Sequence, residues 1–136
     1  MSKPELSAAL AGILALGVLV REAHWNVRGD AFYAQHKMLG KFYAALDGFA
    51  DEFAERIVQL DGTPSADAGP LPPVRGSDRV RLVQRQGVDL LRAFKVEAAD
   101  TAAHDPVTLD LFIRASAMLA KQLWFVSATF NGSLDA

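Results

Sequence analysis

Two histidines and two acids give this chain a set of side chains that can bind a metal. His24 and His36 are twelve residues apart, and Asp51 and Glu55 follow as an i, i+4 pair. If His36 and Asp51 share one helix, the step of fifteen residues separates them by roughly 22 Å at about 1.5 Å per residue. Metal ligands must lie about 2 to 2.2 Å from their ion. The four residues can therefore form one site only if a second copy of the chain brings its acids to the first copy's histidines.

Each of these residues also has an ordinary structural interpretation. A single histidine on an apolar helix face, such as His24 or His36, is more often a hydrogen-bonded core residue than a ligand. Asp51 and Glu55 without a cation would repel each other mildly, which is common on a solvated face. Taken together, however, imidazoles and carboxylates suit iron. The Glu-x-x-His motif of intrachain di-iron bundles is absent, so a site within one chain is disfavoured.

The composition indicates one soluble domain spanning residues 1–136. The chain is 51% hydrophobic, has a net charge of −2 and contains no cysteine, which leaves imidazole, carboxylate and hydroxyl chemistry and gives no general attraction for nucleic acid. The uncharged run over residues 7–20 is shorter than the roughly 20 residues of a membrane span. We expect it to form a buried helix of a mature cytoplasmic protein.

Four helices account for nearly all of the chain, at about residues 4–26, 30–61, 77–100 and 106–131, because no stretch shows the two-residue alternation of a strand. This predicts an all-α fold. The first helix has an apolar face that ends at His24. The residues of that face are Leu10, Ile13, Gly17, Val20 and His24.

The second helix is long, with Asp30 as its expected N-cap and an end near Gly62. Its apolar positions recur every seven residues, at Phe32, Leu39, Leu46, Phe53 and Leu60, backed by Tyr43, Ala50 and Ile57. At 100° per residue, the polar side chains of interest fall along one edge of that apolar stripe, where another subunit would touch. They are His36, Asp47, Asp51 and Glu55.

The connection over residues 63–76 contains four prolines and can reach at most about 46 Å, whereas the third helix should be about 36 Å long. The connection can therefore cross the length of a bundle, which is what a ferritin-like four-helix bundle requires between its second and third helices. For the fourth helix, Asp105 is the expected N-cap and Pro106 the first helical residue. Its inner face is Leu109, Phe112, Ser116, Leu119, Leu123, Val126 and Phe130.

The polar motifs together resemble the DNA-protection-during-starvation (Dps) family of mini-ferritins. The resemblance lies in His24-Trp25-Asn26-Val27-Arg28-Gly29, in His36, and in Asp51-x-x-x-Glu55-Arg56. Asp105-Pro106-Val107-Thr108-Leu109-Asp110 and Lys121-x-x-Trp124 are similar to that family's fourth helix. The resemblance covers almost the whole chain.

The resemblance implies a hollow dodecamer of four-helix subunits that binds Fe(II) at two-fold interfaces. Such shells oxidise the iron, preferably with hydrogen peroxide rather than oxygen, and store the ferric product. Carried over by position, His24 and His36 come from one subunit, and Asp51 and Glu55 come from its partner. The family also suggests that Trp25 lies beside the metal site and that Asp105 and Asp110 line a pore that admits iron. Helix capping alone, however, explains Asp105. Trp124 is better explained as a core or interface residue.

One departure from the family pattern concerns the iron site. The family usually has an aspartate four residues after the second histidine, and this chain has Gly40 there. The second iron position then loses an anchor, and slower oxidation is the expected consequence. An alternative hypothesis is therefore a structural cage with impaired ferroxidase activity.

A third hypothesis is a DNA-compacting cage associated with the nucleoid. The short segments before the first helix and after the fourth offer only Lys3 as a basic side chain, whereas phosphate neutralisation requires several. We therefore expect DNA binding to be weak or absent.

Overall fold

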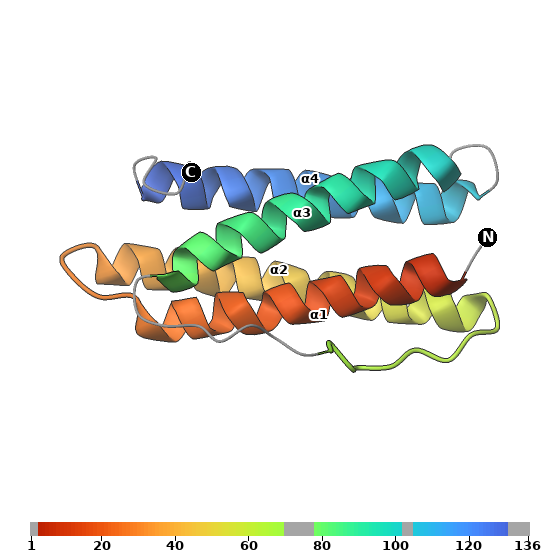
Figure 1. Ribbon diagram of the computed structural model, residues 1–136, viewed down its shortest axis with the longest axis horizontal. Coiled ribbons are helices and arrows are strands. Elements are labelled where there is room, and N and C mark those ends of the chain that lie inside the picture. The colour runs from red at the N-terminus through yellow and green to blue at the C-terminus, as the bar shows by residue number, and fades with distance from the viewer. Residues whose placement is uncertain (1–2, 70–77, 102–104, 131–136) are drawn as a thin grey trace.

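The computed structural model describes residues 3–69, 78–101 and 105–130. The four helices are α1 (Lys3–Asn26), α2 (Phe32–Gln59), α3 (Asp78–Thr101) and α4 (Pro106–Thr129). They lie side by side along one axis, with α1 against α2 and α3, and α4 against α2 and α3 (Figure 1). The expected all-α, ferritin-like bundle is confirmed. The helix ends expected at residues 77 and 131 lie outside the described residues.

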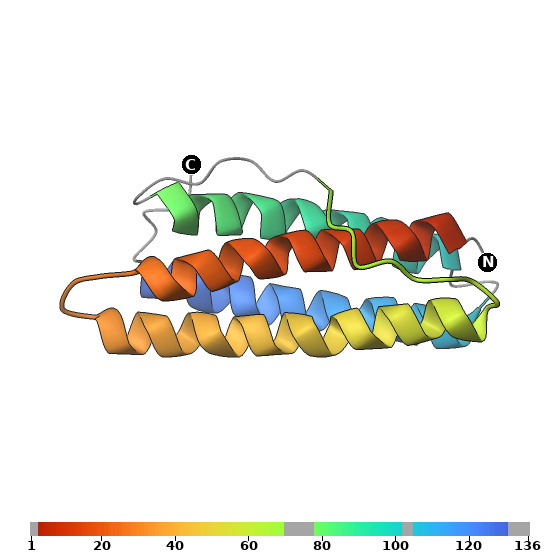
Figure 2. The same cartoon turned by 90° about the horizontal axis from the view of Figure 1, so that it is seen from below.

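The second and third helices run in the same direction. Figure 2 shows that α2 ends at the opposite end of the bundle from the start of α3, and that residues 60–69 turn back beside α1. A parallel pair of successive helices requires a connection along the whole bundle, so the long crossover is also confirmed.

The core consists of apolar side chains from all four helices, joined by a cluster of aromatic rings. Phe53 of α2, Phe94 of α3 and Phe112 of α4 are fully buried, and their ring centroids lie 5.2 to 5.4 Å apart. Phe32 is the exception among the predicted inward positions of α2, since it is 40% exposed at the first residue of the helix. Although α1 is long and apolar enough to cross a membrane, nearly half of its most apolar stretch is buried within the bundle.

The two ends of α2 differ from the sequence prediction. Ala31 rather than Asp30 occupies the N-cap position, and no side chain caps the helix there. At the other end Asp61, rather than a glycine, adopts the left-handed conformation with φ 65°. The amide of Gly62 donates to the carbonyl of Ile57 and that of Asp61 to the carbonyl of Val58, which is the Schellman pattern with glycine one position later than usual.

Candidate metal centre

The turn between α1 and α2 brings His24 and His36 together. Val27 is buried, and Gly29 has a φ of 102°, a left-handed value that residues with a side chain rarely adopt, so the chain reverses within five residues. The two imidazole rings stack with their centroids 3.8 Å apart and an angle of 13° between their planes. The structure therefore unites the two histidines that the sequence singled out.

The histidines hold each other by a reciprocal pair of hydrogen bonds. Nδ1 of His24 lies 2.6 Å from the carbonyl oxygen of His36, and Nδ1 of His36 lies 2.7 Å from the carbonyl oxygen of His24. Because a carbonyl oxygen can only accept, each Nδ1 must carry the proton. In the neutral form of each ring the lone pair is then on Nε2, and neutral histidine is the form that binds metals.

The stacking also determines how many ions the pair can serve. The lone pair of an imidazole nitrogen lies in the plane of its ring, and these two planes are nearly parallel. Their lone pairs therefore do not converge on a point about 2.0 to 2.1 Å from both nitrogens. As stacked, the two rings suit two separate ions rather than one shared ion.

One aromatic side chain stacks on the histidine pair, and the two tryptophans are exposed. Phe32 stacks on His36 with the ring centroids 5.0 Å apart, which explains the position of this exposed phenylalanine. Trp25, next to His24, is 62% exposed, and Trp124 is 65% exposed. Neither tryptophan is a core residue of the protomer, so the core interpretation of Trp124 is wrong and an interface role stays a prediction.

The two acids lie on α2 away from the histidines. Asp51 and Glu55 are both exposed, and within the described part of the chain neither forms a hydrogen bond or an ion pair. Among residues 3–69, 78–101 and 105–130, no three metal-binding side chains of the His, Cys, Asp or Glu types gather in one place. A single protomer therefore presents two candidate half-sites, a histidine pair and an acid pair, at separate places.

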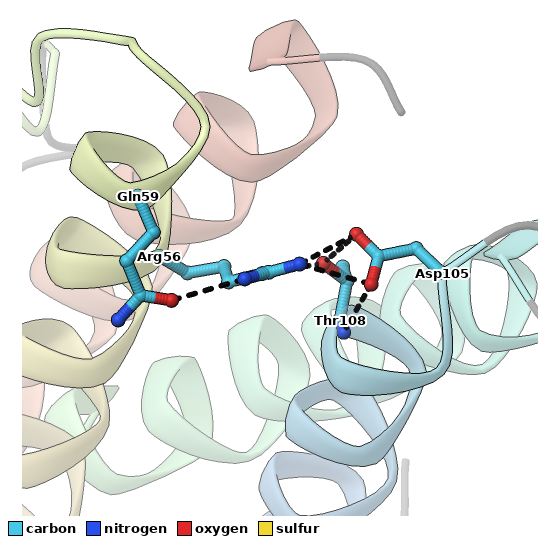
Figure 3. Close-up of polar contacts among 4 residues, drawn as sticks. All are labelled: Arg56, Gln59, Asp105 and Thr108. Carbon is cyan, nitrogen blue, oxygen red and sulfur yellow. Dashed lines mark hydrogen bonds and ion pairs between the residues drawn. The ribbon is translucent and has the colours of Figure 1, made fainter.

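The register of α2 against α4 is held by Arg56, the residue after Glu55. Figure 3 shows its guanidinium reaching across to the first turn of α4. Nη2 of Arg56 donates to both carboxylate oxygens of Asp105 at 2.9 Å, and Nε donates to Oγ1 of Thr108 at 2.9 Å. The sequence suggested Arg56 only as part of a motif, and nothing in the sequence identified its partner.

Asp105 caps α4 as predicted. It accepts from the backbone amide of Thr108 at 3.1 Å and from the hydroxyl of Thr108 at 2.6 Å. Burial by itself raises the pKa of this carboxyl, but the hydrogen bonds from Thr108 and Arg56 outweigh burial and lower the pKa from 3.8 to about 2. Asp105 is therefore a buried anion whose oxygens are already engaged.

The other expected pore acid, Asp110, is 64% exposed and belongs to a second ion-pair network. Arg114 donates to Asp110 at 2.9 Å on its own helix, and pairs with Glu52 of α2 at 2.9 Å. The hydrogen bonds that Arg114 donates to Glu52 and then to Asp110 raise the pKa of its guanidinium. The structure thus places Asp105 and Asp110 in separate networks, one buried and one at the surface.

Gly40 lies against the ring of His24. A Cβ atom built on Gly40 would stand 2.9 Å from Cε1 of His24 and 3.3 Å from its Nδ1. The sequence indicated only that a carboxylate is missing here, because a contact with a residue of another helix leaves no mark in the spacing of residues.

The chain matches known proteins over most of its length. Residues 4–132 match the family model described as a ferritin-like domain. The DNA protection during starvation protein of Agrobacterium fabrum is 34% identical, over 90% of this chain and 83% of the relative, and the fine tangled pili major subunit of Haemophilus ducreyi is 30% identical, over 90% and 71%. The structure of Dps from Microbacterium arborescens in the high iron form is similar with a TM-score of 0.84, at 25% identity, over 94% of this chain and 91% of that one.

Proposed function

The chain belongs to the Dps family of ferritin-like proteins, and from this premise we propose that it oxidises Fe(II) and stores the ferric product. Proteins of this family form cage-like oligomers that bind iron, and the name of its relatives records DNA protection. The observation that carries the proposal is the histidine pair, whose two Nδ1 protons are held by backbone carbonyls so that both Nε2 atoms are free. Iron is the substrate in this proposal.

The site is completed by a second subunit. His24 and His36 of one subunit meet Asp51 and Glu55 of its partner across a two-fold interface, and each imidazole contributes to a different Fe(II) ion. The exposure of both acids and their freedom from partners within the described residues support this arrangement. Carboxylates also balance the charge of the ions, which neutral imidazoles cannot do.

Two neighbouring ions match the chemistry of the oxidant. Hydrogen peroxide accepts two electrons, so two Fe(II) ions each lose one electron while peroxide and two protons become two molecules of water. The protein holds both ions within reach of one peroxide and prevents its one-electron reduction to a radical. We propose peroxide as the preferred oxidant and oxygen as a slower one.

Iron entry is proposed to depend on Asp110. Asp105 was expected beside it, but Arg56 and Thr108 already occupy the oxygens of Asp105, and its role here is to cap α4. Asp110 is exposed and its charge is compensated by Arg114, so it can exchange that partner for a passing cation.

Complementation between two inactive variants tests the shared site. His24→Ala removes a ligand from the histidine half-site, and Asp51→Asn removes one from the acid half-site, so each variant alone should fail to oxidise Fe(II) after an anaerobic titration and a peroxide pulse. In a shell assembled from both, one of the two sites in each mixed dimer contains only intact residues. Random mixing should therefore restore about one quarter of the wild-type sites.

The controls separate a failed site from a failed shell. Both variants must assemble to the wild-type size, and Asp89→Asn, which removes an exposed acid of α3, should keep full activity. If the co-assembled variants stay inactive, the two half-sites do not meet across an interface. If wild type binds Fe(II) but does not oxidise it, the chain is a cage without ferroxidase activity.

A further inference from the structure

The start of α2 and the end of α4 form a pocket that contains none of the four proposed iron ligands. The two segments lie at the same end of the bundle (Figure 2), and the hydroxyl of Thr129 donates to Sδ of Met38 at 3.2 Å where they meet. The pocket has a volume of about 530 Å³. Its cationic, amide and aromatic lining residues are Tyr33, Lys37, Lys41, Lys121, Gln122 and Phe125.

Three lysines give this pocket a positive charge. Lys37 and Lys41 lie one turn apart on α2, and Lys121 comes from α4. No acid is among the described residues that line the pocket, and within the same part of the chain none of the three lysines forms an ion pair. Because cations gathered without counter-charges repel one another, an anion that enters the pocket stabilises all of them. The charge of the pocket therefore favours an anionic ligand.

Two aromatic rings lie beside these cations. Nζ of Lys37 stands over the ring of Tyr33, 5.8 Å from its centroid, and Nζ of Lys121 stands over the ring of Phe125 at 5.6 Å. A cation–π contact at an exposed site is weak, so each ammonium can leave its ring for an anionic group. Tyr33 is 70% exposed, and a flat ring of the ligand can then stack on the face that the ammonium has left.

The size of the pocket favours an organic anion over a free ion. Pockets of about 300 to 1,000 Å³ bind small organic molecules, through apolar and aromatic walls with a few placed polar groups. An inorganic phosphate would use the lysines but leave Tyr33 and Phe125 without a contact. In addition, Oε1 of Gln122 is buried and has no hydrogen-bond partner among the described residues, so it needs an N–H donor.

We propose that this pocket binds a nucleoside phosphate. The phosphate pairs with Lys37, Lys41 and Lys121, the base stacks on Tyr33, and an amino group of the base donates to Oε1 of Gln122. Adenine fits this acceptor, because its edge carries an amino donor. The inference goes beyond the proposed function and does not depend on it, since no iron ligand takes part.

Equilibrium binding of three probes to the assembled, metal-free protein tests the proposal. At low ionic strength AMP should bind saturably with a Kd below about 1 mM, and added salt should weaken it. Adenosine lacks the charge and inorganic phosphate lacks the base, so each should bind about tenfold more weakly or worse. Isothermal titration calorimetry measures all three.

Variants on both helices locate the binding site. Lys37→Gln and Lys121→Gln each remove one cation from the pocket and should weaken AMP binding about fivefold or more. Lys95→Gln, the matched control, removes an exposed lysine of α3 outside the pocket and should leave the affinity unchanged. Tyr33→Leu removes an exposed ring, and should weaken AMP about fivefold while leaving inorganic phosphate unchanged. All variants are compared as shells of wild-type size.

Three results would overturn the inference: no saturable binding of AMP to wild type, equal binding of AMP and inorganic phosphate, or equal losses of affinity in Lys95→Gln and the pocket variants. Binding of single-stranded DNA by a protein that does not bind AMP would also overturn it. That result would show a surface for polyanions rather than a pocket for one nucleotide.

Discussion

Arg56 of α2 forms a two-oxygen ion pair with Asp105 at the N-terminus of α4. Both donor–acceptor distances are 2.9 Å, and the side chains are only 15% and 11% exposed. Because successive residues of a helix point about 100° apart, turning Arg56 toward α4 leaves its neighbour Glu55 at the surface. The ion pair therefore fixes the rotation of α2 that presents the acid half-site.

Removing the cation of this pair should destabilise the fold. Arg56→Leu leaves the carboxylate of Asp105 buried without its charged partner, and should lower the free energy of unfolding by about 3 kcal/mol. Urea denaturation at fixed protein concentration measures the change. Arg92→Leu is the matched control, because its partner Asp89 is 72% exposed and lies 3.6 Å away, and it should cost less than about 0.5 kcal/mol. Equal losses of unfolding free energy in the two variants would show that the buried ion pair contributes no more to stability than the exposed one.

The same carboxyl should make the protein sensitive to acid. The pKa of Asp105 in the folded state is about 2, below the ordinary 3.8, so the unfolded state binds a proton more readily. The stabilisation is therefore fully present above pH 3.8 and is lost as the pH falls toward 2. It amounts to about 2 kcal/mol.

Asp105→Asn isolates this contribution, because asparagine still caps a helix but does not titrate. The variant should be less stable than wild type at neutral pH, and the difference should shrink as the pH approaches 2. Unfolding curves of both proteins between pH 6 and pH 2 measure it. A difference that stays constant over that range would contradict the assigned pKa.

Two helix glycines should respond to alanine in opposite directions. A Cβ on Gly87 of α3 would stand 2.5 Å from Cδ2 and 3.3 Å from Cγ of Leu123, a buried residue of α4, whereas a Cβ on Gly48 meets nothing within 4 Å. Gly87→Ala should cost about 1 to 3 kcal/mol by overpacking. Gly48→Ala should gain about 0.5 to 1 kcal/mol from helix propensity. Thermal unfolding of the two variants compares them directly, and a gain at both positions would show that α3 and α4 can separate freely.

Local signals in the sequence predicted one helix end correctly and missed others. Asp105 and Pro106 were predicted as the N-cap and the first residue of the fourth helix, and the structure confirms both. Asp30 is also a residue type that commonly caps a helix, but it does not cap α2. It lies in the turn around Gly29 that brings His36 back to His24, and α2 begins two residues later. The start of α2 therefore depends on tertiary contacts, which a local sequence pattern cannot predict.

For the candidate site, the sequence predicted that the histidines and the acids lie apart within one protomer, but not the geometry of the histidine pair. Spacing alone separates His24 and His36 from Asp51 and Glu55, and the structure keeps the two pairs apart within a protomer. The reciprocal hydrogen bonds of the histidines involve backbone carbonyls, which every residue has, so no residue type marks them in the sequence. For the same reason Gly40 could be seen only as a missing carboxylate and not as the neighbour of His24.

Arg114 lets the proposed entry route for iron be tested without removing an acid. Its guanidinium pairs with Asp110 and Glu52, so two exposed carboxylates share one cation near the start of α4. If Fe(II) passes these acids, Arg114 competes with it for them. Removing the positive charge should then make this surface more attractive to cations.

Arg114→Gln should accordingly raise the initial rate of Fe(II) uptake, by about two- to threefold at low ionic strength, with the gain shrinking as salt screens the exposed charges. Stopped-flow absorbance of ferric product, recorded on shells of wild-type size, measures the rate. Arg92→Gln removes an arginine that is 76% exposed, against 46% for Arg114, and whose partner is Asp89 of α3, and it should leave the rate unchanged. An unchanged rate in Arg114→Gln would place the entry route elsewhere. An equal gain in both variants would show that the faster uptake comes from the net charge of the shell rather than from Asp110.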